Sequence, residues 1–321
     1  MNGIAAPIVA LESAELPEFM DARADAHVDA CGGGVSVVMV VYMTGEALEE
    51  SVACALKDPL VDELVIVDNG STSAEAACLR TLADQDPRVV LVAGQGNVGF
   101  AKGANLGART AKGDILVFLN PDAFLQPGCI GELSREIVGR QVPCIVGGRV
   151  LNADLTEQRG ARRGEITPMT ALMSLSGLAK RSHAWRRYEV HWEDETSPDE
   201  PAAVPTISGA CFCMRREDFD AVDGFDEKYF LHVEDVDLCW RVRRQGGLVL
   251  FHPKAEVIHL GHTSLTSPIR VEFHKGVGLA RYFRKRAVGV TQRVVAWLLL
   301  PVVVGAAILR PVLWRFRGRA G

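Results

Sequence analysis

Three carboxylates lie within four positions of residues 230–240, which read FLHVEDVDLCW. Glu234, Asp235 and Asp237 would repel one another in this mostly apolar stretch unless the fold offsets the repulsion. A carboxylate held in this way can take the proton of an attacking hydroxyl, and we predict that Asp235 is such a general base. We expect Glu234 and Asp237 to orient it and, by repulsion, to make it more basic, with Asp237 the more structural of the two. The alternative is an acidic helix start, which the helix dipole favours.

Two further acids follow apolar runs that we expect to be buried strands. Asp68 follows residues 64–67 and begins an Asp-Asn-Gly turn, and Asp122 ends the Asn-Pro-Asp that follows residues 115–119. At a strand end, the Asp68 carboxylate can accept a hydrogen bond from the N3–H of uracil or thymine. The Asp122 oxygen suits a hard divalent cation that neutralises a diphosphate leaving group. Simple turns are the alternative for both, with Asp68 capping the next helix.

A glycine-rich segment and a histidine complete the candidate site. Residues 96–107, GNVGFAKGANLG, open a helix with glycines that permit close approach to a nucleotide, and Asn97 and Asn105 offer polar contacts. The pattern is neither GxGxxG nor a P-loop, and close helix packing through its later glycines is the alternative. His259, in VIHLGHTS, is either a metal or phosphate ligand or a hydrogen-bonded structural residue.

The order and spacing of these segments are more specific than any one of them. VDNGST, GNVGFAKGANLGA, LNPD, SGACFCMRREDFDAVDGFDEKYFLHVEDVDLCWRV and VIHLGHTS together resemble glycosyltransferase family 2. Within that family the chain is similar to the rhamnosyltransferase-like branch that builds bacterial surface polysaccharides. The resemblance covers about residues 35–285. It implies a GT-A fold, a UDP- or dTDP-sugar donor, Mg²⁺ or Mn²⁺, and inversion at the anomeric carbon.

The resemblance also implies a role for individual residues. Asp235 matches the base, with Glu234 beside it, and Asp122 and His259 match metal ligands. The segment expected at the donor sugar and diphosphate contributes Gly209, Ala210 and Arg215. The residues expected to bind the donor nucleotide are Tyr42, Asp68, Asn69, Asn97, Gly99, Lys102, Asn105 and Asn120. Two departures are Val-Tyr-Met where the family has Thr-Tyr-Asn at the first strand end, and Asn-Pro-Asp in place of two acids at the metal.

Alternating strands and helices are needed to bring these residues together. The apolar runs predict strands at 35–41, 64–67, 89–92, 115–119, 207–214 and 248–251. The helical patterns lie at 46–56, 74–83, 100–110 and 234–245. This order predicts an α/β fold with a mainly parallel, Rossmann-like sheet flanked by helices. Ligands gather at the carboxyl ends of the strands of such sheets, where Asp68 and Asp122 are expected.

Charge divides the 321-residue chain into three parts. Residues 1–34 carry six acids and one arginine, whereas residues 281–321 carry nine basic residues and no acid. Because the net charge of the whole chain is −5, the body between them has a net charge of −9. We therefore predict a flexible acidic leader at 1–34, a GT-A domain at 35–285 and a basic, apolar tail at 286–321. An acidic body with a basic tail argues against nucleic acid as a partner.

The tail contains an uncharged apolar run, residues 294–309, which is interrupted by Pro301. Sixteen helical residues span about 24 Å, less than the roughly 30 Å of a hydrocarbon core. We predict an interfacial or re-entrant helix that binds anionic lipid at the inner face of the cytoplasmic membrane, next to a lipid-linked saccharide acceptor. A single spanning segment and a helix docked on the body remain alternatives. The eight cysteines form no CxxC pair and no signal peptide is evident, which fits a cytoplasmic protein.

Other activities are compatible with a fold of this kind. A sugar-phosphate nucleotidyltransferase would need a glycine-rich triphosphate loop after the first strand, but Gly32-Gly33-Gly34 precedes that strand. A catalytically silent, membrane-associated nucleotide-sugar scaffold would not need Asp68, Asp122 and Asp235. The basic cluster Arg159, Arg162 and Arg163 suggests either contact with an acceptor phosphate or, more simply, solvated surface charges.

Overall fold

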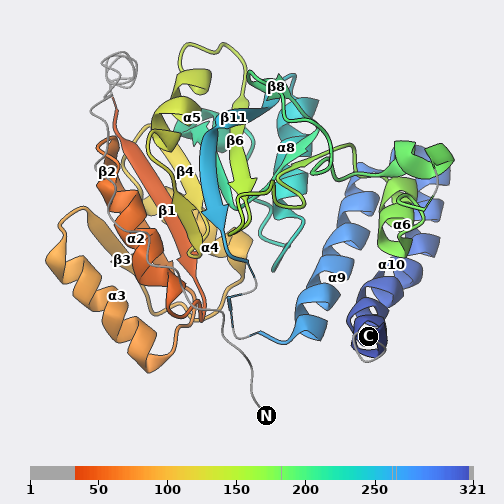
Figure 1. Ribbon diagram of the computed structural model, residues 1–321, viewed down its shortest axis with the longest axis horizontal. Coiled ribbons are helices and arrows are strands. Elements are labelled where there is room, and N and C mark those ends of the chain that lie inside the picture. The colour runs from red at the N-terminus through yellow and green to blue at the C-terminus, as the bar shows by residue number, and fades with distance from the viewer. Residues whose placement is uncertain (1–32, 182, 262, 265, 318–321) are drawn as a thin grey trace.

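A computed structural model describes residues 33–181, 183–261, 263–264 and 266–317, so the predicted leader lies almost entirely outside the described residues (Figure 1). Within them, nine strands form one central sheet. These strands are β1 (Val35–Val41), β2 (Val61–Asp68), β3 (Val89–Val92), β4 (Ile115–Leu119), β5 (Ala123–Leu125), β6 (Cys144–Leu151), β8 (Ala202–Ala203), β10 (Cys211–Arg215) and β11 (Leu248–His259). A separate two-stranded sheet pairs β7 (Arg162–Arg163) with β9 (Thr206–Ile207).

The sheet is mixed, with one parallel half. Its order is β3-β2-β1-β4-β10-β6-β11-β5, and β8 pairs with β11. The first four strands of this order are parallel, whereas β10 runs antiparallel to both of its neighbours. Strands β1 and β4 are buried along their whole length, as expected for apolar strands that are covered on both faces. This arrangement confirms the predicted α/β fold of GT-A type.

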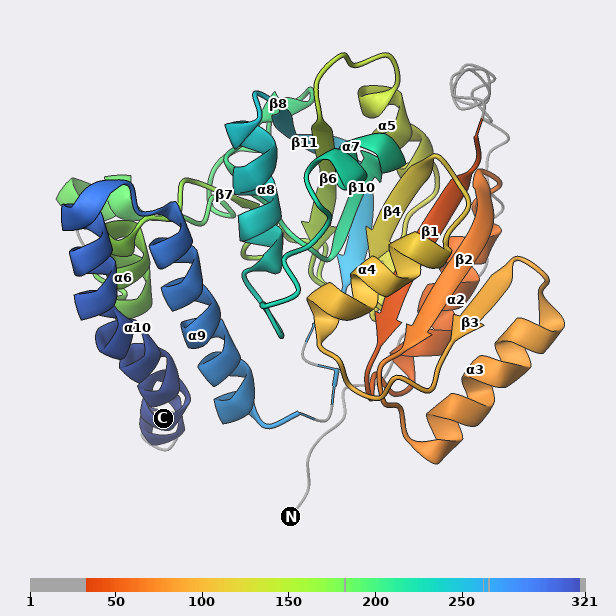
Figure 2. The same cartoon turned by 180° about the vertical axis from the view of Figure 1, so that it is seen from behind.

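Helices cover both faces of the sheet (Figures 1 and 2). One face carries α2 (Ala47–Lys57), α3 (Ser73–Gln85) and α5 (Cys129–Ile137), whose apolar residues join one buried cluster with the odd-numbered residues of β1. The other carries α4 (Phe100–Thr110), α7 (Arg216–Ala221) and α8 (Glu234–Arg244). The strand predicted at 207–214 is in fact two, β9 and β10, because the chain turns between them at Gly209.

Three further helices stand beside the sheet (Figure 2). They are α6 (Pro168–Ser176), α9 (Pro268–Arg286) and α10 (Gly289–Arg317), of which α9 and α10 form an antiparallel hairpin. A Cβ added to Gly276 of α9 would lie 3.0 Å from the Cβ of Ala307, so glycine permits the close approach of the two helices. The interruption predicted at Pro301 does not occur, because α10 continues through it at the cost of one backbone hydrogen bond.

Helix α10 is also longer than predicted. Its residues 289–308 have a mean hydropathy of 1.7 and are mostly not buried. At 1.5 Å per residue these 20 residues extend about 30 Å, so length no longer argues against a membrane span. By length and composition, this is the one helix among the described residues that could cross a membrane.

Helix α9 packs directly against the segment that carries the three carboxylates. A Cβ added to Gly278 would lie 3.0 Å from the His232 carbonyl oxygen, and the His274 ring stacks on Phe230 with 4.6 Å between centroids. Lys285 Nζ also lies 2.8 Å from the Asp237 carboxylate. The hairpin is therefore joined to the α/β body at the start of α8.

Candidate active site

Helix α8 begins after a backbone turn that few side chains tolerate. His232 and Val233 have φ angles of 66° and 74°, in the left-handed region. The turn places all three carboxylates in the first helical turn, where the helix dipole favours them. Asp237 is fully buried and accepts hydrogen bonds from Tyr229 Oη at 3.2 Å and Arg241 Nε at 2.7 Å. The expectation that it is structural agrees with these contacts.

Asp235 has both carboxylate oxygens occupied. Its Oδ1 accepts a hydrogen bond from the Val236 N–H at 2.8 Å, and its Oδ2 accepts one from the Gly209 N–H at 3.2 Å. The Arg163 guanidinium forms an ion pair with the same Oδ2. Burial raises the pKa of Asp235, but the charge and hydrogen bond of Arg163, with the Val236 N–H, bring it below its ordinary value. The prediction that repulsion makes Asp235 more basic is therefore wrong for this structure.

Glu234, and not Asp235, has the raised pKa. Its side chain is buried, and Oε2 has no hydrogen-bond partner in the part of the chain that the structure describes. Burial, and then the neighbouring charge of Asp235, raise the pKa of Glu234 to about 8. Two adjacent carboxylates thus have pKa values shifted in opposite directions, a property typical of acid–base sites.

The two predicted metal ligands meet at the ends of β4 and β11. His259 Nε2 lies 3.2 Å from Asp122 Oδ1, while Thr263 Oγ1 donates to Asp122 Oδ2 at 2.9 Å. The Gln158 amide donates to the His259 carbonyl oxygen, and its Oε1 lies 2.7 Å from His259 Nδ1. This contact orients Nδ1 as a donor, while Nε2 lies 3.2 Å from both Asp122 Oδ1 and the Asn120 amide nitrogen. Burial raises the pKa of Asp122, and the His259 and Thr263 contacts more than reverse this.

This donor set fits a divalent cation that has few protein ligands. The Asp122 carboxylate oxygen and the His259 ring nitrogen lie 3.2 Å apart and are ligand types that a divalent cation accepts. No group of three or more His, Cys, Asp or Glu side chains suited to a metal occurs among the described residues. Asp122 and His259 could therefore supply part of a coordination sphere for Mg²⁺ or Mn²⁺, with substrate phosphates and water supplying the rest.

The predicted nucleotide residues form a second cluster at the ends of β1 and β2. Asp68 Oδ1 accepts hydrogen bonds from the N–H groups of Gly70 and Ser71, so this oxygen shapes its own turn. The Asn69 and Asn97 side chains are joined at 3.3 Å, which ties this turn to the glycine-rich loop. The Tyr42 ring lies against the same turn, 3.5 Å from where a Gly70 Cβ would stand.

The glycine-rich loop in turn contacts the segment that leads to Asp235. Gly99 has a φ of 85°, and a Cβ there would lie 2.7 Å from the Phe230 carbonyl oxygen. Lys102 is exposed on α4. Asn105 is buried farther along that helix, where its amide both donates to and accepts from the backbone of Phe225 at 2.9 Å. Those bonds give Asn105 a structural role, and the geometry does not support its predicted nucleotide contact.

The residues predicted to bind the donor sugar lie at opposite ends of β10, with Gly209 and Ala210 at the site and Arg215 away from it. Gly209 contacts Asp235, and the Ala210 carbonyl accepts a hydrogen bond from the Asn120 N–H at 2.9 Å. Because β10 is antiparallel to β4, Arg215 pairs with Ile115 at the opposite end of that strand. Four residues of strand separate it from the site by roughly 13 Å. The Arg215 guanidinium binds Asp218 there, so its predicted diphosphate contact is not supported. The Asn120 amide, 3.2 Å from His259 Nε2, belongs to the metal half.

Comparison with known proteins agrees with this geometry. The profile of glycosyl transferase family 2 matches residues 36–223, which is more than half of the chain. The chain belongs to glycosyltransferase family 2. A second profile, the N-terminal domain of galactosyltransferase, matches residues 194–263, which include Asp235 and His259.

The glycosyltransferase has several similar relatives. An N-acetylglucosaminyl-diphospho-decaprenol L-rhamnosyltransferase of Mycobacterium tuberculosis is 28% identical over 237 residues, which cover 70% of this chain and 75% of the relative. The succinoglycan biosynthesis protein ExoA of Rhizobium meliloti is 26% identical over 266 residues, covering 82% of this chain and 73% of the relative.

Two solved structures share the fold. GalNAc-T7 with UDP, GalNAc and Mn²⁺ superimposes with a TM-score of 0.57 at 17% identity, over 78% of this chain and 48% of that one. This glycosyltransferase thus matches about half the length of GalNAc-T7. The mannosyltransferase PcManGT from Pyrobaculum calidifontis, in complex with GDP-Man and Mn²⁺, gives a TM-score of 0.55 at 16% identity, over 87% and 74%.

Sequence reasoning missed Gln158, and it named Arg163 only as a candidate phosphate contact and missed its ion pair with Asp235. Both come from the irregular segment after β6, in which only the basic cluster was a signal. Surface solvation, the simpler explanation of that cluster, is wrong for two of its members. Arg162 is buried against Glu157, and Arg163 pairs with Asp235. Arg159 is the more exposed member and lies near acids of the neighbouring loop.

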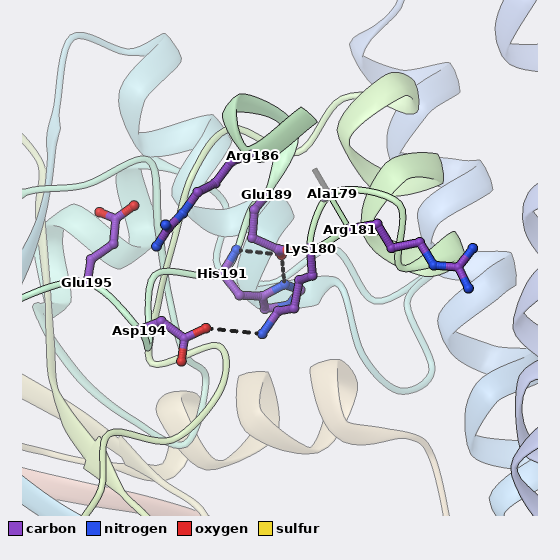
Figure 3. A pocket seen from close by; sticks show the side chains of 8 residues that line it. All are labelled: Ala179, Lys180, Arg181, Arg186, Glu189, His191, Asp194 and Glu195. Carbon is purple, nitrogen blue, oxygen red and sulfur yellow. Dashed lines mark hydrogen bonds and ion pairs between the residues drawn. The ribbon is translucent and has the colours of Figure 1, made fainter. Parts of the chain in front are cut away.

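A cavity of about 400 Å³ in the glycosyltransferase lies beside this basic cluster (Figure 3). Arg159 lies 3.3 Å from the His191 ring that lines it, and Arg162 donates to the Glu195 carbonyl oxygen. Its lining is Ala179, Lys180, Arg181, Arg186, Glu189, His191, Asp194 and Glu195. The lining has three basic and three acidic side chains, of which Lys180 pairs with Asp194 at 3.3 Å and Arg181 points away from the acids (Figure 3). Burial and the charge of Arg159 lower the pKa of His191 to about 4, so its ring is neutral at pH 7. The side chains that line the cavity therefore carry no net charge, and the Arg159 guanidinium lies next to them.

Proposed function

We propose that this glycosyltransferase moves a sugar from a nucleoside diphosphate to a hydroxyl of a lipid-linked saccharide, with inversion at the anomeric carbon. The proposal is carried by one arrangement. The Asp235 carboxylate is held by the Gly209 N–H, in the same turn whose Ala210 carbonyl binds Asn120, two residues before Asp122. The proposed base, Asp235, and the carboxylate proposed to bind the cation, Asp122, are thereby fixed on either side of one turn. A single displacement requires such fixed positions.

The reaction needs one proton acceptor and no covalent enzyme intermediate. Asp235 takes the proton of the acceptor hydroxyl as that oxygen forms a bond to the anomeric carbon. The bond from this carbon to the diphosphate oxygen breaks at the same time, and its electron pair leaves with the nucleoside diphosphate. Attack from the opposite face inverts the configuration. When a divalent cation is bound by Asp122 and His259, it supplies positive charge to the departing diphosphate.

The nucleotide is proposed to bind at the ends of β1 and β2. Asp68 Oδ1 is used by its own turn, which leaves Oδ2 to accept the N3–H of uracil or thymine. Tyr42 and Asn97 lie beside it. The buried Asn69 instead holds the glycine-rich loop through the Val98 N–H, and the buried Gly99 lies against Phe230. Lys102 offers an exposed positive charge. UDP- and dTDP-sugars both fit this contact. Rhamnose is proposed as the sugar, and surface polysaccharide synthesis as the setting, because relatives bear those names.

Donor choice is testable by thermal stability. We expect UDP- or dTDP-sugars with Mn²⁺ or Mg²⁺ to raise the unfolding temperature, because a ligand that binds the folded state stabilises it by mass action. At 100 times the Kd the gain is about 2.7 kcal/mol. A panel of UDP-, dTDP- and GDP-sugars measured by differential scanning fluorimetry would show which donor raises the unfolding temperature. Asp68→Asn, which changes the proposed contact with the base, should show a smaller rise. No shift with any uracil or thymine nucleotide would contradict the nucleotide site.

The hairpin is proposed to hold the enzyme at the inner face of the cytoplasmic membrane. Apolar side chains of α9 and α10 are exposed at Ile269, Phe273, Val277, Val290, Val294, Trp297, Leu298 and Val302. The Arg284 guanidinium lies over the Trp297 ring at 5.0 Å, so a cation accompanies the apolar face. Because α9 packs on the α/β body and α10 on α9, we favour a hairpin that lies in the interface over an isolated span.

Acidic side chains introduced on the apolar face of the hairpin should release the protein from membranes. Trp297 and Leu298 are 60% and 69% exposed, so replacing both with Asp should leave the fold intact. Each lost apolar contact is worth about 1.5–3 kcal/mol, which predicts a more than tenfold decrease in binding to phosphatidylglycerol vesicles. Val142→Asp, at an exposed apolar residue away from the hairpin, is the control. Deleting residues 288–321 should act in the same way. If that truncated protein still sediments with membranes, the tail is not the anchor.

A further inference from the structure

The ion pair between Arg163 and Asp235 is an obstacle to the proposed chemistry. The two backbone N–H groups and the guanidinium already take up most of the acceptor capacity of Asp235, and Oδ2 carries two of these three contacts. The guanidinium also lowers the pKa of Asp235, which weakens it as a base. The backbone donors are fixed by the fold, so Arg163 is the partner that can move.

Arg163 is placed to change partners. It lies on β7, and its guanidinium also donates to the Ile207 carbonyl at 2.8 Å. Its Nε is buried and has no hydrogen-bond partner among the described residues. The side chains of Arg163 and Asp235 are 16% and 13% exposed, so a small opening connects the pair to solvent. An arginine with an unused donor beside one carboxylate is suited to a second anion.

The same short segment reaches the metal half of the site. Gln158, five residues before Arg163, holds both the ring and the carbonyl of His259. The Ala161 carbonyl between them accepts a hydrogen bond from the Ser208 N–H, next to the Gly209 that contacts Asp235. Arg163 is therefore tied through one backbone segment to the place where a cation and a diphosphate are proposed to bind.

We propose that Arg163 is shared between Asp235 and a phosphate of a diphosphate substrate, so that substrate binding releases the base. This inference rests on the proposed function, because it takes Asp235 as the base. Arg163 is a positioning residue that keeps Asp235 paired until an anion competes for its guanidinium. The diphosphate belongs either to the nucleotide donor or to a lipid-linked acceptor, since both offer the oxygens that a guanidinium binds.

Competition for Arg163 makes an unusual prediction about binding. Removing the charge of Asp235 frees the guanidinium, so Asp235→Asn should bind a diphosphate more tightly than the wild type does. The expected gain is about tenfold, the size of one charge-assisted hydrogen bond. Arg163→Met should weaken the same ligand, Arg163→Lys should weaken it less, and the double variant should show no gain over Arg163→Met. A purely structural ion pair would give no gain in Asp235→Asn.

Calorimetric titrations with UDP, dTDP and farnesyl diphosphate, with and without Mn²⁺, test this directly. Tighter binding of UDP or dTDP by Asp235→Asn assigns the donor diphosphate, and tighter binding of farnesyl diphosphate assigns an acceptor diphosphate. Arg140→Met is the control for a lost positive charge, because Arg140 pairs with Glu136 before β6 begins, at the opposite end of that strand from the site.

The proposal is overturned if Asp235→Asn binds none of these ligands more tightly, or if the gain persists when residue 163 is methionine. Should Asp235→Asn fail to fold by circular dichroism, equal affinities of the wild type and Arg163→Met for all three ligands would overturn it. These are binding measurements, so they can fail while sugar transfer and its dependence on Asp235 stand.

Discussion

Asp235→Asn should retain nucleotide binding and lose sugar transfer. The amide keeps the size of the carboxylate but cannot take a proton from the acceptor hydroxyl, and general bases contribute about 10²–10⁴-fold to turnover. The nucleotide contacts at the ends of β1 and β2 do not involve Asp235, so UDP or dTDP should bind at least as tightly as before. Turnover and nucleotide affinity measured on the same preparation separate loss of chemistry from loss of fold.

A matched carboxylate elsewhere controls for this change. Asp86 pairs with Arg88 before β3, at the end of the sheet opposite the candidate site. Asp86→Asn removes a similar ion pair and should leave kcat within about twofold, since exposed pairs contribute about 0–1 kcal/mol. Unchanged turnover in Asp235→Asn would remove Asp235 as the base and direct attention to Glu234, whose pKa is raised by burial.

Substitution of the proposed metal ligands should change the metal requirement. Asp122→Asn and His259→Gln each change one of the two proposed metal-ligand atoms, Asp122 Oδ1 and His259 Nε2, which lie 3.2 Å apart. We expect the Mn²⁺ concentration for half-maximal activity to rise by at least about tenfold, because even outer-shell changes at metal sites cost about 10–100-fold. Activity measured across a Mn²⁺ titration at saturating donor gives this value.

The Thr263 hydroxyl provides an internal comparison for the metal site. Thr263→Val removes a hydrogen bond to Asp122 Oδ2 but neither proposed ligand, so its effect should be smaller than that of Asp122→Asn. If the metal requirement of Asp122→Asn and His259→Gln equals that of the wild type, the proposed cation is held elsewhere.

The parallel half of the sheet could be predicted because its strands are uninterrupted apolar runs that are buried on both faces. The predicted bounds of β1, β3, β4 and α4 agree with the structure. Strand β6 escaped prediction because two glycines, Gly147 and Gly148, fall inside it and break its apolar pattern. A Cβ at Gly147 would lie 2.6 Å from the Ile207 Cβ, so the glycine admits β9 against the sheet.

Long-range contacts account for the rest. The reversal of β10 moves Arg215 away from Gly209, and a local motif carries no information about strand direction. The ion pair of Asp235 joins residues 72 positions apart, from a segment without periodicity. The three clustered acids could be found from the sequence, but the sign of the pKa shift of Asp235 depends on Arg163 and required the structure.

The most direct measurement of the central claim is nucleoside diphosphate release from UDP- and dTDP-sugars in the presence of lipid-linked acceptors extracted from bacterial membranes. The account predicts release by the wild-type protein that requires both a divalent cation and the acceptor, and release at the background rate by Asp235→Asn. Equal release by the two proteins, or no release by the wild type with any uracil or thymine donor, would contradict it.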